Sequence, residues 1–128
     1  MKTIIILLNV TILMVLSFNT YSDEAIMKTI KIFGEKEIST ADNINNILDN
    51  ATKKASECRD NGGDSIVCMC KLRKENNALR TAVEEALEQH QNWKGKAVSY
   101  KKKNKGYMLS FTGLMYQFEY FEKECNNK

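Results

Sequence analysis

Four cysteines set the strongest constraint on what this chain can fold into, and two of them, Cys68 and Cys70, are separated by a single residue. An α-helix turns about 100° per residue, so side chains two positions apart point in nearly opposite directions. If this segment is helical, Cys68 and Cys70 can neither bond to each other nor bind one metal ion together. The spacing therefore predicts two disulfides that leave the segment toward different neighbours.

The remaining cysteines, Cys58 and Cys125, are the partners that this interpretation requires. Cys58–Cys68 with Cys70–Cys125, and Cys58–Cys70 with Cys68–Cys125, both satisfy the geometry, because spacing alone does not fix connectivity. We favour the first pairing, since Cys58 and Cys68 both fall on the apolar stripes of their predicted helices. In either case the bridge to Cys125 closes a long loop, which in the chain-entropy account stabilises by roughly 4 kcal/mol.

The N-terminus predicts a compartment in which disulfides persist. Residues 1–22 have the order of a secretory signal peptide: one lysine, an apolar run over residues 4–18, and then small and polar residues. Thr20 and Ser22 suit the two small-residue positions of a cleavage site, so we place cleavage after Ser22. The apolar run is shorter than the roughly 20 residues of a membrane-spanning helix. We expect an exported protein, periplasmic or secreted, without a stable membrane anchor.

Length and charge narrow the class of protein further. The chain has 128 residues, which suits a signal peptide followed by a single domain over residues 23–128. Its net charge of +3 is small and gives no general attraction to nucleic acid or to an anionic membrane. The chain has no proline, which suits a mainly helical domain and excludes collagen-like and proline-rich classes.

Three segments show the spacing of apolar residues that is typical of amphipathic helices. The first covers residues 41–58, and the Asn-Gly-Gly sequence that follows it predicts a turn. The second begins after a cap at Asp64 or Ser65 and ends near Trp93. The third covers residues 112–125, with its first residue, a threonine, as the cap.

Two further segments are shorter. Within residues 96–112, apolar residues recur at every second position on both sides of a polar turn, which predicts a β-hairpin. In the turn, Asn104 and Gly106 are the residues expected to adopt positive φ. Residues 23–38 fit both a strand and a helix, and we favour a short helix that ends at Gly34. The predicted fold class is mainly α (α+β): three to four helices and one β-hairpin, stapled by two disulfides.

The densest cluster of charge lies at the tip of the predicted hairpin, where lysines are flanked by aromatic residues. Lysines in such a place keep a strand edge from pairing with other chains, and they also suit contact with an acidic partner. We therefore predict a partner contact at this tip. Its candidate residues are Lys101, Lys102, Lys103, Lys105, Tyr100 and Tyr107.

No catalytic constellation stands out in the sequence. His90 is the only histidine and lies on an apolar stripe, which favours a packing role; no nucleophile elbow or phosphate-binding loop accompanies it. We therefore expect a non-enzymatic binding protein without cofactor or metal, whose partner is another envelope or secreted protein; an inhibitor- or immunity-type role fits its size. The alternative is a thiol-redox or copper-handling protein centred on Cys68 and Cys70, with Met69 as a soft ligand.

The mass of the exported protein distinguishes these interpretations. We expect a chain that begins at Asp23 and lacks one proton for each of its four cysteines. Intact-mass spectrometry before and after thiol alkylation measures both properties. Two reactive thiols, or a bound copper ion, would reverse the order of the two interpretations.

Overall fold

The structure of the protein is a computed structural model that describes residues 28–126. The predicted signal peptide and its cleavage site lie outside the described residues. The elements, in chain order, are β1 (Thr29–Lys31), α2 (Glu35–Asp60), α3 (Ser65–Lys71), α4 (Arg73–Gln89), a 3-10 turn (Gln91–Trp93), β2 (Ala97–Lys102), β3 (Lys105–Ser110) and α5 (Phe111–Cys125). The described part of the chain is therefore mainly α with a small sheet, as predicted.

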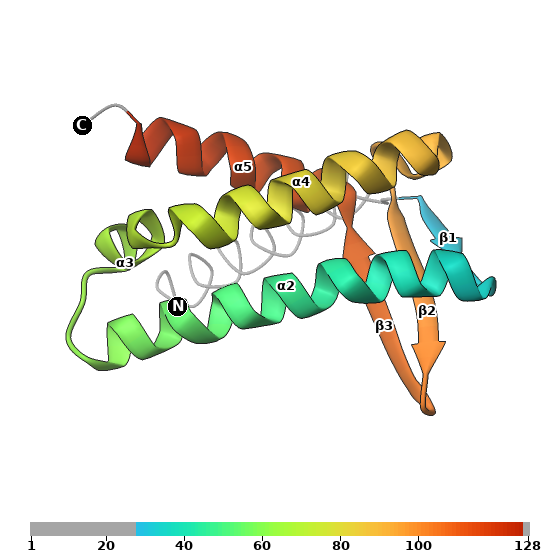
Figure 1. The fold of residues 1–128 in the computed structure, drawn as a ribbon, viewed down its shortest axis with the longest axis horizontal. Helices are drawn as coiled ribbons and strands as arrows, with labels where there is room; N and C mark the ends of the chain where they lie inside the picture. Colours follow the sequence, from blue (N-terminus) through green and yellow to red (C-terminus); the bar gives the residue numbers. More distant parts are fainter. Residues whose placement is uncertain (1–27, 127–128) are drawn as a thin grey trace, which may run out of the picture.

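The three long helices lie side by side with the sheet at one end (Figure 1). Helix α4 runs antiparallel to α2 and also to α5, which returns from the sheet toward α3. Short α3 lies at the opposite end from the sheet, where α2 and α5 both finish. The structure thus has two ends of different character, one holding the cysteines and the other holding the hairpin.

Both disulfides have the favoured connectivity, Cys58–Cys68 and Cys70–Cys125. Their Cα–Cα distances are 5.7 Å and 5.3 Å, within the ordinary range for disulfides. Gly63 lies against the first bridge: a Cβ atom built there would be 2.4 Å from the Cys68 sulfur. Only glycine therefore fits at this position without displacing the bridge.

The sheet has one strand that the sequence analysis did not predict. Strand order is β1–β2–β3, with β1 parallel to β2 and β2 antiparallel to β3. The short helix expected over residues 23–38 is wrong: β1 lies within it, and Gly34 precedes α2 instead of ending a helix. Ile30 lies opposite Val98, a partner distant in sequence, and Ile32 is buried beside this pair. This non-local pairing decides in favour of the strand.

The predicted second helix is divided into α3 and α4. Asp64 caps α3 as expected, its carboxylate accepting the N–H groups of Ile66 and Val67. The helix then breaks at Leu72, whose N–H binds the carbonyl of Met69 in a tighter turn. This break lets α3 change direction, so that its two cysteines reach α2 and α5.

Other helix boundaries also differ from the prediction. Helix α2 begins at Glu35, earlier than expected, and α4 ends at Gln89, before the 3-10 turn that buries Trp93. Helix α5 begins at Phe111, and its cap is Ser110 rather than Thr112: the Ser110 hydroxyl accepts the N–H of Gly113 at 3.0 Å. The earlier starts of α2 and α5 add Ile38 and Phe111 to the residues that form or pack against the core.

Aromatic residues fill the centre of the core where the helices meet the sheet. Trp93 and Phe111 are fully buried and lie 5.5 Å apart between ring centroids. Val83 of α4 and Val98 of β2 are buried in the same cluster. The hairpin is thereby joined to the helices by apolar packing.

The two disulfides should contribute unequally to stability. In the chain-entropy account, the Cys70–Cys125 bridge, with a sequence separation of 55, contributes about 4 kcal/mol, and the Cys58–Cys68 bridge, with a separation of 10, about 3 kcal/mol. Urea denaturation of Cys70→Ala/Cys125→Ala and Cys58→Ala/Cys68→Ala measures the difference. A larger loss for the second variant would contradict the loop-length explanation.

Candidate partner-binding groove

The hairpin turns at Lys103 and Asn104, whose φ angles are +48° and +64°. Two consecutive residues with positive φ give the type I′ turn that matches the twist of antiparallel strands. The predicted positive φ is confirmed at Asn104 and wrong at Gly106, which lies in β3. The turn is tighter than predicted, so Lys102 and Lys105 lie directly opposite each other at its base.

Tyr100 fixes the hairpin to α2. Its ring is 4% exposed and stacks on Tyr107 at 5.2 Å between centroids. The side-chain amide of Asn45 donates to the Tyr100 hydroxyl at 2.6 Å, and this hydroxyl lies 3.4 Å from a carboxylate oxygen of Asp42. Burial raises the pKa of the Tyr100 hydroxyl. Tyr100 therefore holds the strand in place from beneath, whereas Tyr107 is partly open to solvent.

Among the described residues, an ion-pair partner is found for one of the four tip lysines. Lys102 forms an ion pair with Asp42, and this hydrogen bond raises the pKa of Lys102. Lys101, Lys103 and Lys105 are exposed, and within residues 28–126 none of them forms an ion pair. Their three charges remain available to a partner.

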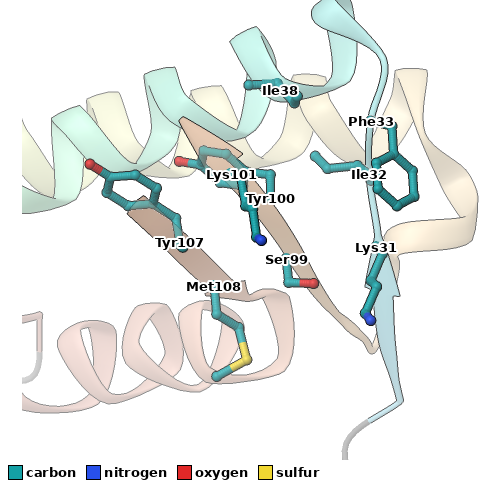
Figure 2. A pocket seen from close by; sticks show the side chains of 10 residues that line it. Lys31, Ile32, Phe33, Ile38, Ser99, Tyr100, Lys101, Tyr107 and Met108 are labelled. Atoms are coloured by element: carbon teal, nitrogen blue, oxygen red, sulfur yellow. The ribbon is translucent and has the colours of Figure 1, made fainter. Parts of the chain in front are cut away.

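A groove of about 710 Å³ lies beside the hairpin, between it and the connection from β1 to α2 (Figure 2). Ile32 and Phe33 approach from that connection, and Tyr107 and Met108 from β3. We call this feature the hairpin groove. Its lining residues are Lys31, Ile32, Phe33, Ile38, Ser99, Tyr100, Lys101, Gly106, Tyr107 and Met108.

The hairpin groove combines exposed apolar surface with positive charge. Phe33 is 83% exposed and Met108 67%, so the groove presents two large apolar side chains to solvent. Lys31 and Lys101 lie along the same surface, and no ion pair within the described residues neutralises either one. Such a surface suits a partner that offers both apolar side chains and carboxylates.

Three of the six predicted contact residues line this groove: Tyr100, Lys101 and Tyr107. Lys31 and Phe33 were not predicted as contact residues, because parallel pairing with β2 brings them to the groove from a distant part of the chain. The alternation of Ile30 with Ile32 was the local signal for the strand that carries them.

The cysteines of the alternative redox or copper site, and His90, all make contacts that serve the fold. Cys68 and Cys70 belong to different disulfides, so their sulfurs form neither a dithiol pair nor a joint metal site in this structure. The ring of His90 stacks on Trp93 at 4.1 Å between centroids. Among residues 28–126, no cluster of three histidine, cysteine or acidic side chains is placed to hold a metal ion.

A second hollow, of about 330 Å³, lies between α2, α4 and α5. Leu48, Met69 and Tyr120 are among its lining residues, and no charged side chain lines it. The lining of this hollow is uncharged and mostly apolar, and it carries no group that indicates the chemistry of a partner.

Comparisons of the chain with protein-family models, with curated proteins and with solved structures found no match. The residues of the hairpin groove and the disulfide scaffold that supports it are therefore the features that bear on function.

Because of the Lys102–Asp42 ion pair, we expect the folded protein to lose stability at alkaline pH. The pKa values of Lys102 and Tyr100 are both raised in the folded protein, above 10.5 and 10.0 respectively. A raised pKa gives stability that is complete below the unfolded-state pKa and is lost as pH rises through the folded-state pKa. The melting temperature should therefore fall above pH ~10. Asp42→Asn should lower it at neutral pH and flatten this alkaline decline.

Circular dichroism melts across the pH range measure both effects. Glu75→Gln is the control, because the hydrogen bond from Lys54 lowers the pKa of Glu75 and so affects the acidic limb instead. Stability from that pair is present above the unfolded-state pKa and is lost as pH falls through the folded-state pKa. Parallel alkaline curves for wild type and Asp42→Asn would contradict the assigned role of the pair.

Proposed function

We propose that the protein is a small exported, non-enzymatic binding protein, and that it holds part of another envelope or secreted protein in the hairpin groove. One observation carries the proposal: exposed apolar side chains come together at this groove with lysines that form no ion pair within residues 28–126. Phe33 and Met108 supply the apolar surface, and Lys31 and Lys101 supply the charge. Exposed apolar residues bordered by polar groups are typical of interaction sites.

The rest of the described structure supports this role as a scaffold. The two disulfides constrain the end that is distant from the hairpin, and Tyr100 fixes the hairpin to α2. A surface that is ordered before binding loses less conformational entropy when the partner arrives. An inhibitor- or immunity-type role fits a small, rigid scaffold that presents one groove.

Export agrees with the disulfides, because disulfides persist mainly in oxidising compartments. Within residues 28–126, no helix combines the length and apolar character needed to cross a bilayer. On the strength of the two disulfides we propose that the protein acts in the periplasm or outside the cell, where its partner is another exported protein.

The thiol-redox or copper-handling alternative has less support. It requires both bridges to open so that Cys68 and Cys70 become free thiols, and Cys68 is buried in its bridge. The binding proposal requires no change in the covalent structure.

Affinity capture from the protein's own compartment tests the proposed function. The mature protein should retain a partner that Lys101→Glu/Lys103→Glu/Lys105→Glu loses, because repulsion replaces attraction at the tip. The matched control is Lys53→Glu/Lys71→Glu/Lys94→Glu, which changes the net charge equally at exposed lysines elsewhere. Quantitative mass spectrometry of the captured proteins should show at least a tenfold loss for the hairpin variant alone. Equal capture by all three proteins would contradict the proposal.

A further inference from the structure

Strand β3 forms one edge of the sheet, since β2 is its only neighbour among the described strands. In an antiparallel pair, residues that lie opposite each other either bond to each other or both direct their backbone groups away from the pair. The register of β2 and β3 therefore shows which residues of β3 face outward.

Successive residues of β2 direct their backbone hydrogen bonds alternately to β1 and to β3. The N–H of Ala97 donates to Lys28 at 3.0 Å, and the carbonyl of Ser99 accepts from Ile32 at 2.9 Å, so both residues bond on the β1 side. Ser99 lies opposite Met108 in the register. The backbone N–H and carbonyl of Met108 consequently point away from β2, toward the open edge.

The same alternation applies to the next outward residue. Lys101 lies opposite Gly106, so the backbone groups of Gly106 also point to the open edge. In the described part of the chain, no hydrogen bond occupies this side of Gly106 or Met108. No atom lies within 4 Å of a Cβ built on Gly106, and residues 105–108 are all exposed. The edge is therefore open to an approaching strand.

Charge along this edge is uneven. Natural proteins often block edge strands with lysines, and here Lys105 and the turn lysines lie at the tip. The remainder of β3, residues 106–110, carries no charged side chain. The hairpin, residues 97–110, also contains no acidic residue. A second copy of β3 would therefore bring further lysines and no carboxylate to pair with them.

We infer that the outer edge of β3 takes an extended, acidic segment of the partner protein as a fourth strand of the sheet. This inference rests on the proposed function and specifies how the partner binds. Backbone groups of Gly106 and Met108 would hold the added strand, and its carboxylates would meet the tip lysines. Peptide addition to a sheet edge is a recurring mode of recognition, in which backbone hydrogen bonds give affinity and side chains give specificity. Side chains of the added strand next to Met108 would lie beside the hairpin groove, because Gly106 and Met108 also line it.

A synthetic peptide of alternating Glu and Val residues is the probe, and fluorescence anisotropy measures its binding to the mature, oxidised protein. Wild type should bind this peptide and should not bind its Lys/Val counterpart. The same Glu/Val peptide with N-methyl groups on adjacent backbone amides should bind at least tenfold more weakly, because neither of its edges can pair with β3.

Met108→Pro is the matching change in the protein. Proline removes the outward N–H of Met108 without removing a hydrogen bond between β2 and β3, and proline is tolerated at such edge positions. We expect at least a tenfold loss of affinity for the Glu/Val peptide. Met108→Val changes the same side chain but keeps the N–H, so Met108→Pro should bind the peptide at least tenfold more weakly than Met108→Val does. Circular dichroism verifies folding, and if Met108→Pro does not fold, the N-methylated peptide decides the question on wild type.

The outcomes separate this inference from the proposed function. Undiminished binding of the N-methylated peptide, or no binding of the Glu/Val peptide, would overturn strand addition. With either of these two results, loss of the captured partner by Lys101→Glu/Lys103→Glu/Lys105→Glu, but not by the control variant, would still support the proposed function. A wild-type dimer in sedimentation that Met108→Pro converts to monomer would also overturn the inference, because the edge would then be occupied by a second copy.

Discussion

The two disulfides that leave α3 in different directions hold one end of this structure together. Cys68 reaches back to the end of α2, and Cys70 reaches forward to the end of α5. The ends of α2 and α5, which are distant in sequence, are therefore both held at α3. With that end constrained covalently, the opposite end is free to present a hairpin and a groove.

Helix phase made two separate bridges from Cys68 and Cys70 predictable, because the directions of these side chains depend only on local geometry, but it left two pairings open. The hairpin was predictable for the same reason, since period two and a polar turn are local patterns. Strand β1 was not, because its identity depends on Val98, which is far away in the chain. The break at Leu72 was also missed, because no glycine or proline marks it and the requirement to reach two cysteine partners decides it.

The candidate site likewise has one part that the sequence predicts and another part that depends on the fold. Charge density identified Lys101 and its neighbours, which indeed lie exposed at the tip. It did not reveal that Tyr100 is buried, because that depends on Asn45 and Asp42 of α2. The apolar part of the groove around Phe33 could not be predicted from the sequence, because it depends on the pairing of β1 with β2. A surface assembled from separate segments requires the fold before its chemistry can be described.

Backbone amide hydrogen exchange at Gly106 and Met108 tests the central claim most directly, namely that the hairpin end is the binding end and β3 is its open edge. Residue-resolved exchange by NMR, with and without the Glu/Val peptide, is the measurement. Both amides should exchange rapidly in the free protein and become protected on binding, while exchange in α3 stays unchanged. Protection that appears in α3 and the ends of α2 and α5, with no change at Gly106 and Met108, would contradict the account.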